Sequence, residues 1–299
     1  MDFSGIERIC NTYGCFCEKN YNLANKTTMK VGGECGIFAE AVSEESLTEL
    51  LKVCREREIP FFILGKGSNV LINRFSGAVI VLGGELSKSS FEGNFVTAGA
   101  GASLLGVCVK ALNHSLSGME CLYGIPGSVG GALYMNAGAY GGEMKDIVRS
   151  ARCIDDRGEI IELSAEEMEL SYRKSVFSEK NLCILSVTME LSRDDKVAIK
   201  SKMDTLTKQR REKQPLEFPS CGSTFKRPKD GFAAALIEEC GLKGFSVGGA
   251  QVSEKHSGFV INRGGATFSD VMTLVEHIKR AVLEQKGVEL ECEMLIIDG

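Results

Sequence analysis

The sequence lacks the features of several protein classes. No hydrophobic run approaches the roughly 20 residues that span a bilayer, and the N-terminal residues MDFSGIERIC have neither the basic start nor the hydrophobic core of a signal peptide. We therefore expect a cytoplasmic protein with no membrane partner. The net charge of -5 also leaves no basic excess for phosphate backbones, so we expect no nucleic-acid partner.

Metal ligands are scarce as well. Only three histidines occur in 299 residues, and no CxxC spacing marks a zinc site among the twelve cysteines. Without a secretion signal we expect these thiols to be reduced. Most lie in hydrophobic segments, as Cys54 and Cys108 do, where a thiol serves as a small hydrophobic side chain. We expect no metal site, and the role of the cluster Cys10, Cys15 and Cys17 stays open.

What is present is typical of a globular protein of two domains, with 43% hydrophobic and 25% charged residues. Ser43 is expected to cap one helix, and Ser269 to cap another that ends at Gly287. The last segment alternates with period two, so it is expected to form a strand from Val288 to Ile296 with three glutamates on one face. Further expected strands are 61–64, 78–82, 95–99, 148–154, 160–163, 182–191 and 258–262, and further expected helices lie near 104–112 and 232–240.

Two glycine-rich stretches follow hydrophobic segments. Tyr123 to Glu143 reads YGIPGSVGGALYMNAGAYGGE, in which seven glycines and no charged side chain before Glu143 allow a ligand to approach the backbone closely. Any phosphate held there would be bound by backbone N–H groups and the start of a following helix. The second stretch, Gly65 to Ile72, fits neither a Walker A loop nor GxGxxG. Taken alone, each stretch could equally be a set of tight turns.

Together these and other motifs resemble the UDP-N-acetylenolpyruvoylglucosamine reductase family. The resemblance runs from Thr27 almost to the end of the chain. It rests on seven motifs in the family's order: TTMKVGG, LGKGSNVLI, YGIPGSVGGALYMNAGAYGGE, SYRKSVF, CGSTFKRP, AALIEECGLKGFSVGGAQVSEKHSGFVIN and LECEMLIIDG. The short path from Tyr172 into the last domain is similar to the family's smaller type, which lacks an extra loop over the substrate.

The resemblance implies an α+β fold: an FAD-binding domain of the vanillyl-alcohol-oxidase (PCMH) type with two α+β subdomains, then an α+β substrate-binding domain. The expected ranges are 1–26 for a peripheral segment, 27–195 for the FAD domain (subdomains 27–58 and 59–195) and 196–299 for the substrate domain. FAD is expected to be non-covalent and NADPH a co-substrate. The implied cofactor contacts are Lys66, Gly67, Ser68, Asn69, Val70, Leu71, Gly124, Ile125, Pro126, Gly127, Ser128, Gly130, Gly131, Asn136, Ala137, Gly138 and Ala139.

The implied activity is NADPH-dependent reduction of the enolpyruvyl group of UDP-N-acetylglucosamine enolpyruvate to UDP-N-acetylmuramate, a step of peptidoglycan synthesis that serves cell-wall biogenesis, cell shape and cell division. Negative charge that develops next to the carboxylate needs fixed cationic partners and a proton donor. By similarity Ser223 donates the proton, while Arg173 and Glu293 stabilise the charge. Without the family, Ser223 could be a turn hydroxyl and Arg173 a member of a surface ion pair.

The resemblance also implies substrate contacts at Tyr172, Arg211, Lys213, Lys226, Gln251, His256 and Asn262. His256 could equally be a structural histidine. Cys292 and Leu295 stand where the family commonly has Pro and Arg, so one anion contact is either absent or supplied elsewhere. The protein is expected to be a monomer. Two alternatives remain open: another FAD oxidoreductase of this fold, with Cys121 as the nearest thiol for a covalent link, or a catalytically silent nucleotide-sugar-binding protein.

Overall fold

The computed structural model describes residues 1–229 and 231–299. The chain divides into two compact units, each assembled from separate stretches of sequence. The first unit comprises Met1–Asn20, Gly36–Lys66 and Ser76–Gln209, and the second comprises Tyr21–Cys35, Gly67–Phe75 and Arg210–Gly299. Two short segments of the N-terminal half thus group with the C-terminal third, whereas the boundaries expected from sequence follow the chain in order. Those domain boundaries remain a prediction.

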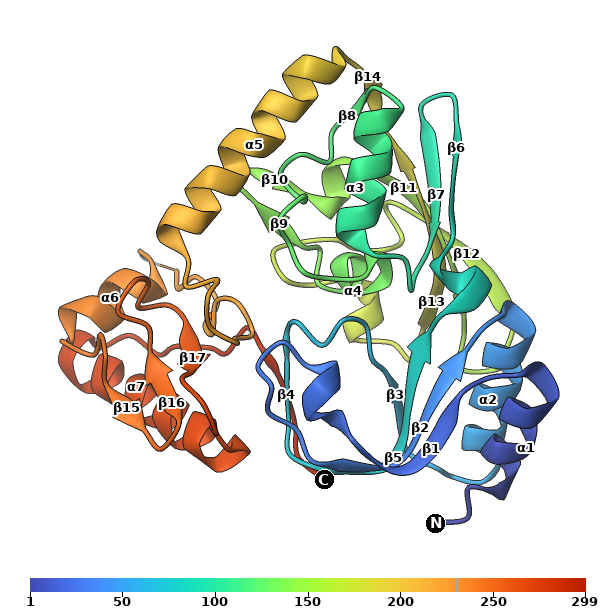
Figure 1. Cartoon of the computed structure of the whole chain (residues 1–299), viewed down its shortest axis with the longest axis horizontal. Coiled ribbons are helices and arrows are strands. Elements are labelled where there is room, and N and C mark those ends of the chain that lie inside the picture. Colours follow the sequence, from blue (N-terminus) through green and yellow to red (C-terminus); the bar gives the residue numbers. More distant parts are fainter. Residues whose placement is uncertain (230) are drawn as a thin grey trace. The chain divides into compact units, whose positions relative to one another are not determined.

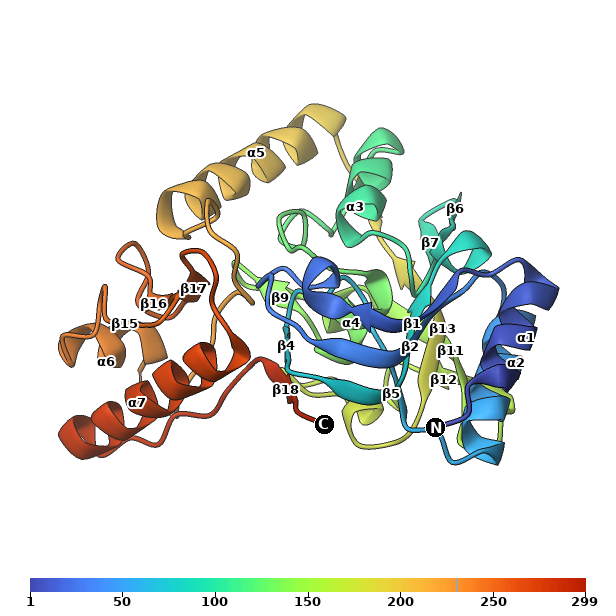
Figure 2. The ribbon, with the colours of Figure 1, turned by 60° about the horizontal axis from the view of Figure 1, so that its bottom comes forward.

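The first unit contains a four-stranded sheet of order β1-β2-β5-β3, in which β3 and β5 are parallel. Helices α1 and α2 lie side by side next to this sheet (Figures 1 and 2). Ser43 caps α2 through a capping box with Ser46, as the sequence predicted. Helix α1 buries Ile6 and Cys10 completely, so it contributes to the core of the unit. The bounds are α1 Ser4–Tyr13, β1 Cys17–Asn22, β2 Glu34–Ala41, α2 Glu44–Glu56, β3 Phe61–Ile63 and β5 Phe75–Leu82.

A second, antiparallel sheet of order β12-β11-β13-β7-β6 completes the larger part of this unit. Helices α3 and α4 pack with it around a core that includes Val107, Leu133 and Val187. Most of these strands begin and end within a residue or two of their predicted limits, because their hydrophobic runs face this core. The bounds are β6 Ser89–Glu92, β7 Phe95–Gly99, α3 Leu104–Asn113, α4 Val129–Tyr134, β11 Val148–Ile154, β12 Ile160–Ser164 and β13 Cys183–Glu190.

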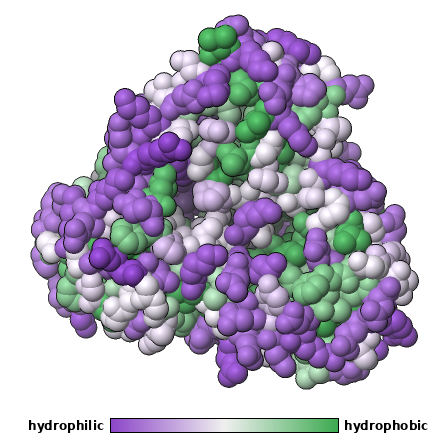
Figure 3. All heavy atoms as spheres, viewed as in Figure 1, coloured by the Kyte–Doolittle hydropathy of each residue, from purple (hydrophilic) through white to green (hydrophobic). Residues whose placement is uncertain are grey.

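Short elements connect these layers, and the long helix α5 follows them. Helix α5 buries only Ile199 and Met203, and Figure 3 shows mostly hydrophilic residues along it. Among the described residues, no helix is long and hydrophobic enough to cross a membrane. The bounds are η1 Leu23–Lys26, η2 Gly84–Ser87, β8 Leu116–Ser117, β9 Gly138–Ala139, β10 Gly142–Glu143, η3 Met144–Asp146, η4 Val176–Ser178, β14 Ser192–Arg193 and α5 Lys196–Lys213.

The second unit combines the antiparallel sheet β15-β16-β17 with helices α6 and α7, and α7 packs against β15 and β16. Strand β18 pairs in parallel with β4, which lies more than two hundred residues earlier in the chain. Their registers join Leu295 to Val70 and Ile296 to Leu71. The bounds are β4 Val70–Ile72, α6 Ala233–Glu239, β15 Ser246–Val247, β16 Ala250–Val252, β17 Val260–Asn262, α7 Phe268–Lys286 and β18 Leu295–Ile297.

Two predictions for this unit need correction. The cap of α7 is Thr267, whose side chain accepts from the N–H of Asp270 in a capping box, while Ser269 lies inside the first turn. The expected strand from Val288 to Ile296 is also wrong, because only Leu295–Ile297 forms a strand. Burial does alternate as far as Met294, but the backbone groups of 288–294 do not pair in a continuous ladder, and Ile296 is exposed.

Candidate functional site

The stretch from Gly65 to Ile72 leaves β3 and turns sharply at Gly67, which has a φ of +62°. A Cβ atom there would lie 2.0 Å from the carbonyl oxygen of Lys26, so only glycine fits. The carbonyl of Gly67 accepts from the N–H of Thr28 at 2.9 Å. Among the described residues, no acceptor takes the N–H groups of Gly67 or Ser68. Since Gly67 is buried, these N–H groups are suited to an anion bound against the turn.

The stretch from Tyr123 to Glu143 packs tightly around Ser128 and Gly130. Ser128 caps α4 and accepts from the N–H of Gly131 at 3.2 Å. A Cβ on Gly130 would lie 2.7 Å from that of Ala100, and a Cβ on Gly65 would lie 2.6 Å from the Ser128 hydroxyl. These glycines therefore permit backbone approaches that any larger residue would block.

The loop between these contacts leaves several donors available. In the part of the chain that the structure describes, the N–H groups of Gly124, Gly127 and Ser128 donate to no protein acceptor, although Ser128 is buried. Helix α4 has only six residues, so loop amides rather than a long helix dipole would contribute most to anion binding.

Asn136 follows α4 and is completely buried, with a positive φ of 39°. Its Nδ2 donates to Glu143 Oε2 and to the Ser171 carbonyl, both at 2.9 Å, and its Oδ1 accepts from the Lys145 N–H at 2.9 Å. The protein itself thus uses the amide group of Asn136, which leaves only its backbone for a cofactor.

Arg173 lies in a tight turn close to this network. The turn is closed by paired backbone bonds between Ser171 and Lys174, and Arg173 has a φ of 56°. Its Nη2 donates to the Gly138 carbonyl at 3.4 Å, and its guanidinium stacks over the exposed Tyr172 ring with 5.0 Å between Cζ and the ring centroid. Two predicted site residues therefore touch, and a third supplies a carbonyl to one of them.

In the second unit, three segments distant in sequence meet around Ser223. Asn69 Nδ2 donates to the Glu293 carbonyl at 3.1 Å, and the Glu293 N–H donates to the Thr224 carbonyl at 2.8 Å. Cys221 Sγ lies 3.1 Å from the Val70 carbonyl. The structure therefore brings a predicted cofactor residue, Asn69, to the predicted catalytic residue Glu293, which in turn bonds to the neighbour of Ser223. Ser223 itself is exposed and Glu293 is half-buried.

The predicted substrate residues of this unit have mixed surroundings. Asn262 is buried, and its side chain donates to the Met29 carbonyl and accepts from the N–H groups of Gly264 and Ala266. Lys226 forms an ion pair with Glu291. These contacts give Asn262 a structural role and balance the charge of Lys226.

Gln251, on β16, donates through Nε2 to the Gly244 carbonyl at 3.0 Å, but its buried Oε1 atom has no hydrogen-bond partner among the residues that the structure describes. His256 is half-buried, and its Nδ1 accepts from the Gly258 N–H at 3.2 Å. Burial lowers the pKa of His256, with a smaller contribution from Lys243, against an opposing hydrogen bond to its own backbone. Arg211 and Lys213 are exposed at the C-terminal end of α5.

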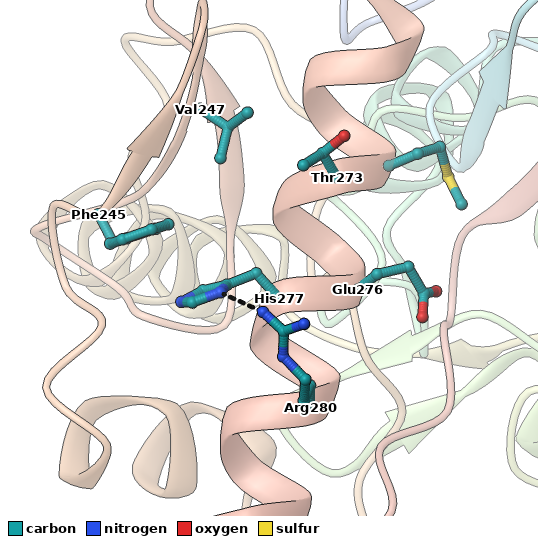
Figure 4. Close-up of a pocket in the computed structure, with 7 residues that line it drawn as sticks. Phe245, Val247, Thr273, Glu276, His277 and Arg280 are labelled. Carbon is teal, nitrogen blue, oxygen red and sulfur yellow. Dashed lines mark hydrogen bonds between the residues drawn. The ribbon is translucent and has the colours of Figure 1, made fainter.

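A separate cavity of about 590 Å³ lies beside α7 (Figure 4). Phe245 stacks on His277 with 4.4 Å between ring centroids, and Arg280 contacts His277 Nδ1 at 3.4 Å. None of the residues that line this cavity is among those predicted to bind cofactor or substrate, so we do not assign it to the reaction.

Comparison with known proteins identifies the family. A reductase from Clostridium perfringens, UDP-N-acetylenolpyruvoylglucosamine reductase, is 51% identical over 270 residues, which cover 90% of this chain and 88% of the relative. The protein of that name from Caldanaerobacter subterraneus subsp. tengcongensis is 47% identical over 280 residues, covering 93% and 92%.

The chain belongs to the UDP-N-acetylenolpyruvoylglucosamine reductase family. Residues 214–297 match the family's C-terminal domain, and residues 36–164 match an FAD binding domain. The crystal structure of the reductase from Thermus caldophilus superposes with a TM-score of 0.82 at 33% identity, covering 95% of this chain and 99% of that one. A berberine bridge enzyme variant shares the fold at 12% identity, with a TM-score of 0.50 over 64% of this chain and 44% of its own. The predicted fold class is confirmed.

FAD is the cofactor of this family member, and each glycine-rich turn, taken by itself, offers backbone donors suited to an anion. The buried N–H groups of Gly67 and Ser128, which have no protein acceptor among the described residues, match the demand of an anion for backbone donors. A Cβ atom at Gly65, Gly67 or Gly130 would collide with Ser128, Lys26 or Ala100 respectively, so these turns can keep their shape only with glycine.

Sequence reasoning missed two residues that shape the site. Thr28 Oγ1 donates to the Ser220 carbonyl at 2.6 Å and also contacts the Gly67 carbonyl. Glu143 binds both Asn136 and Lys145. Burial alone would raise the pKa of Glu143, but hydrogen bonds from Lys145 and Asn136 and the charges of Lys145 and Arg173 lower it overall. Thr28 and Glu143 both lie within the motifs quoted above. The sequence signal that could have identified them is a polar side chain inside a family motif.

Proposed function

We propose that this chain uses NADPH to reduce UDP-N-acetylglucosamine enolpyruvate to UDP-N-acetylmuramate, a step of peptidoglycan precursor synthesis. Membership of the reductase family supports the reaction. The observation that carries the proposal is the meeting of Asn69, Glu293 and the segment that bears Ser223 within one unit. Asn69 in the cofactor turn donates to the Glu293 carbonyl, and Glu293 bonds to Thr224, the neighbour of Ser223, which supports a role of these segments in reduction followed by protonation.

The residues assigned above as cofactor contacts would hold FAD, which would supply the hydride-transfer chemistry between NADPH and the substrate. The protein must then stabilise negative charge on the carboxylate side of the enolpyruvyl group and protonate the adjacent carbon. We assign the proton transfer to the Ser223 hydroxyl. Arg173 supplies a planar, permanently charged guanidinium that matches the geometry of a carboxylate. Glu293 supports the charge distribution around this step.

The diphosphate and sugar need separate contacts. The exposed Arg211 and Lys213 provide positive charge near the C-terminal end of α5, and Tyr172, Lys226, Gln251, His256 and Asn262 complete the proposed set. Gln251 is included because its buried Oε1 atom, which has no partner within the described residues, can accept a hydrogen bond from a substrate group. Asn262 acts by holding the backbone of its loop.

The decisive experiment follows the absorbance of the purified protein. Anaerobic NADPH is expected to bleach the flavin bands, and the enolpyruvyl UDP-sugar is expected to restore them. Bleaching without restoration would favour another FAD oxidoreductase of the same fold. Binding of the UDP-sugar without any turnover would favour a silent binding protein and end the proposal.

The natural setting of the enzyme follows from its substrates. Because NADPH and a nucleotide sugar are made and used in the cytoplasm, we place the enzyme there. We also propose that it acts as a monomer, since the assigned residues all belong to one chain. Sedimentation at micromolar concentration is expected to give a single species near 32.3 kDa, whereas a dimer would contradict the monomer proposal alone.

A further inference from the structure

The turn that carries Arg173 has a strained backbone conformation. Arg173 is the central residue of this short turn, and its φ of 56° is uncommon for a residue with a side chain. In the part of the chain that the structure describes, two backbone bonds close the turn, from Ser171 to Lys174 and back, at 3.0 and 3.2 Å. A turn of this kind at the surface samples other conformations unless neighbouring groups hold it.

Two side-chain bonds hold this turn to the segment at the end of α4. Asn136 Nδ2 donates to the Ser171 carbonyl at 2.9 Å, before Arg173, and Ser175 Oγ donates to the Tyr134 carbonyl at 2.6 Å, after it. Asn136 and Ser175 are 0% and 1% exposed. Both ends of the turn are therefore attached to the same buried stretch of chain.

Asn136 is itself fixed by a complete set of partners. Its second Nδ2 bond goes to Glu143 Oε2, and its Oδ1 accepts from the Lys145 N–H, each at 2.9 Å. Glu143 also pairs with Lys145 Nζ at 2.9 Å. Buried polar groups whose bonds are all satisfied are rigid, because any displacement leaves a donor or acceptor unpaired.

We propose that Asn136 is a positioning residue for Arg173: its amide clamps Ser171 to Glu143 and so fixes the guanidinium for the enolpyruvyl carboxylate. This inference rests on the proposed function. It assigns Asn136 a role in the reoxidation of the flavin by the enolpyruvyl substrate. This role differs from the cofactor contact expected from sequence. The Gly138 carbonyl, which accepts from Arg173 at 3.4 Å, belongs to the hairpin that Glu143 closes, so both contacts act on the same side chain.

Asn136→Asp is the most informative variant. Aspartate tolerates the positive φ, whereas alanine would be strained there. The carboxylate keeps an acceptor for the Lys145 N–H, but it cannot donate to Ser171 and it repels Glu143. We expect reduction of the flavin by NADPH to stay within about threefold of wild type and reoxidation by the enolpyruvyl substrate to slow at least about tenfold.

A second variant separates positioning from folding. In Asn136→Asp/Glu143→Gln, the glutamine amide can donate to the new carboxylate, so the melting temperature is expected to recover. The bond to Ser171 stays lost, so reoxidation is expected to stay slow. Recovery of both quantities would overturn the inference, as would equal slowing of both half-reactions in Asn136→Asp.

The double variant with Arg173→Ala tests whether Asn136 acts through Arg173. The effect of Asn136→Asp on reoxidation is expected to fall below about twofold in that background, and independent multiplication of the two effects would overturn the inference.

Ser46→Ala, which breaks the buried capping box of α2 in the same unit, serves as a destabilised control with unchanged half-reaction rates. A wild-type protein that cannot be reoxidised by the substrate would instead refute the proposed function.

Discussion

The hydroxyl of Ser223 is needed only when a proton reaches the substrate carbon. Ser223→Ala is therefore expected to leave flavin reduction by NADPH within about twofold of wild type and to slow reoxidation by the substrate about a hundredfold or more. Stopped-flow absorbance measures both rates. Ser220→Ala is a matched control, because it keeps the Ser220 carbonyl that accepts from Thr28 Oγ1. Similar losses in both half-reactions would contradict the acid role of Ser223.

His256 makes stability depend on pH. Its pKa is lowered in the folded protein, mainly by burial, from an ordinary value of 6.5. When the pH falls through about 6.5, the unfolded chain gains a proton that the folded chain does not, so stability is lost with acidification. His256→Asn keeps an acceptor for the Gly258 N–H and removes this titration.

Urea unfolding at about pH 7.5 and pH 5.5 is expected to show a smaller loss of stability in the His256→Asn variant than in wild type. Equal losses in both proteins would show that His256 does not titrate as the structure predicts. The comparison isolates this group because every other titrating residue is common to the two proteins.

At the scale of elements, the cap of α7 is Thr267 in the structure, whereas the sequence pattern indicated Ser269. Thr267→Ala removes the side chain that accepts from the Asp270 N–H, and we expect a loss of about 1 kcal/mol in the free energy of unfolding. Ser269→Ala, at an exposed position inside the helix, is expected to change it by less than about 0.5 kcal/mol. Thermal or urea unfolding of the two variants decides this, and the reverse order would contradict the observed cap.

The C-terminal segment shows why the elements were predicted unequally well. Period-two burial is real from Val288 to Met294, but a strand also needs a partner ladder. Among the described residues, the backbone pairing of this region is an isolated bridge between Cys292 and Phe225 and the parallel pairing of Leu295–Ile297 with β4, so no continuous ladder forms over 288–294. Helix α2 was predicted accurately because its cap and hydrophobic face lie within a single stretch of sequence.

For the whole molecule, the prediction concerns FAD retention. Acid precipitation is expected to release the flavin into solution, because burial raises the pKa of the Cys121 thiol and disfavours the thiolate needed for a covalent link. Adding FAD back at about 100 times its dissociation constant is expected to stabilise the native protein by about 2.7 kcal/mol. The shift in melting temperature measures this. Flavin that stays with the precipitate would contradict non-covalent binding.

The sequence by itself determined the family, the fold class, both glycine-rich turns and most helices and strands. These depend on short motifs and on local periodicity, which a single stretch of chain contains. It also indicated Arg173, Ser223 and Glu293 through the family pattern.

Only the tertiary structure decided which of these groups meet. The contacts of Asn69 with Glu293 and of Thr28 with Ser220 join residues about 200 positions apart, and no local pattern encodes such a pairing. The same holds for Asn136, whose amide is used by Ser171, Glu143 and Lys145. A buried polar side chain takes its role from the partners that folding brings to it, because each unpaired donor or acceptor would cost free energy.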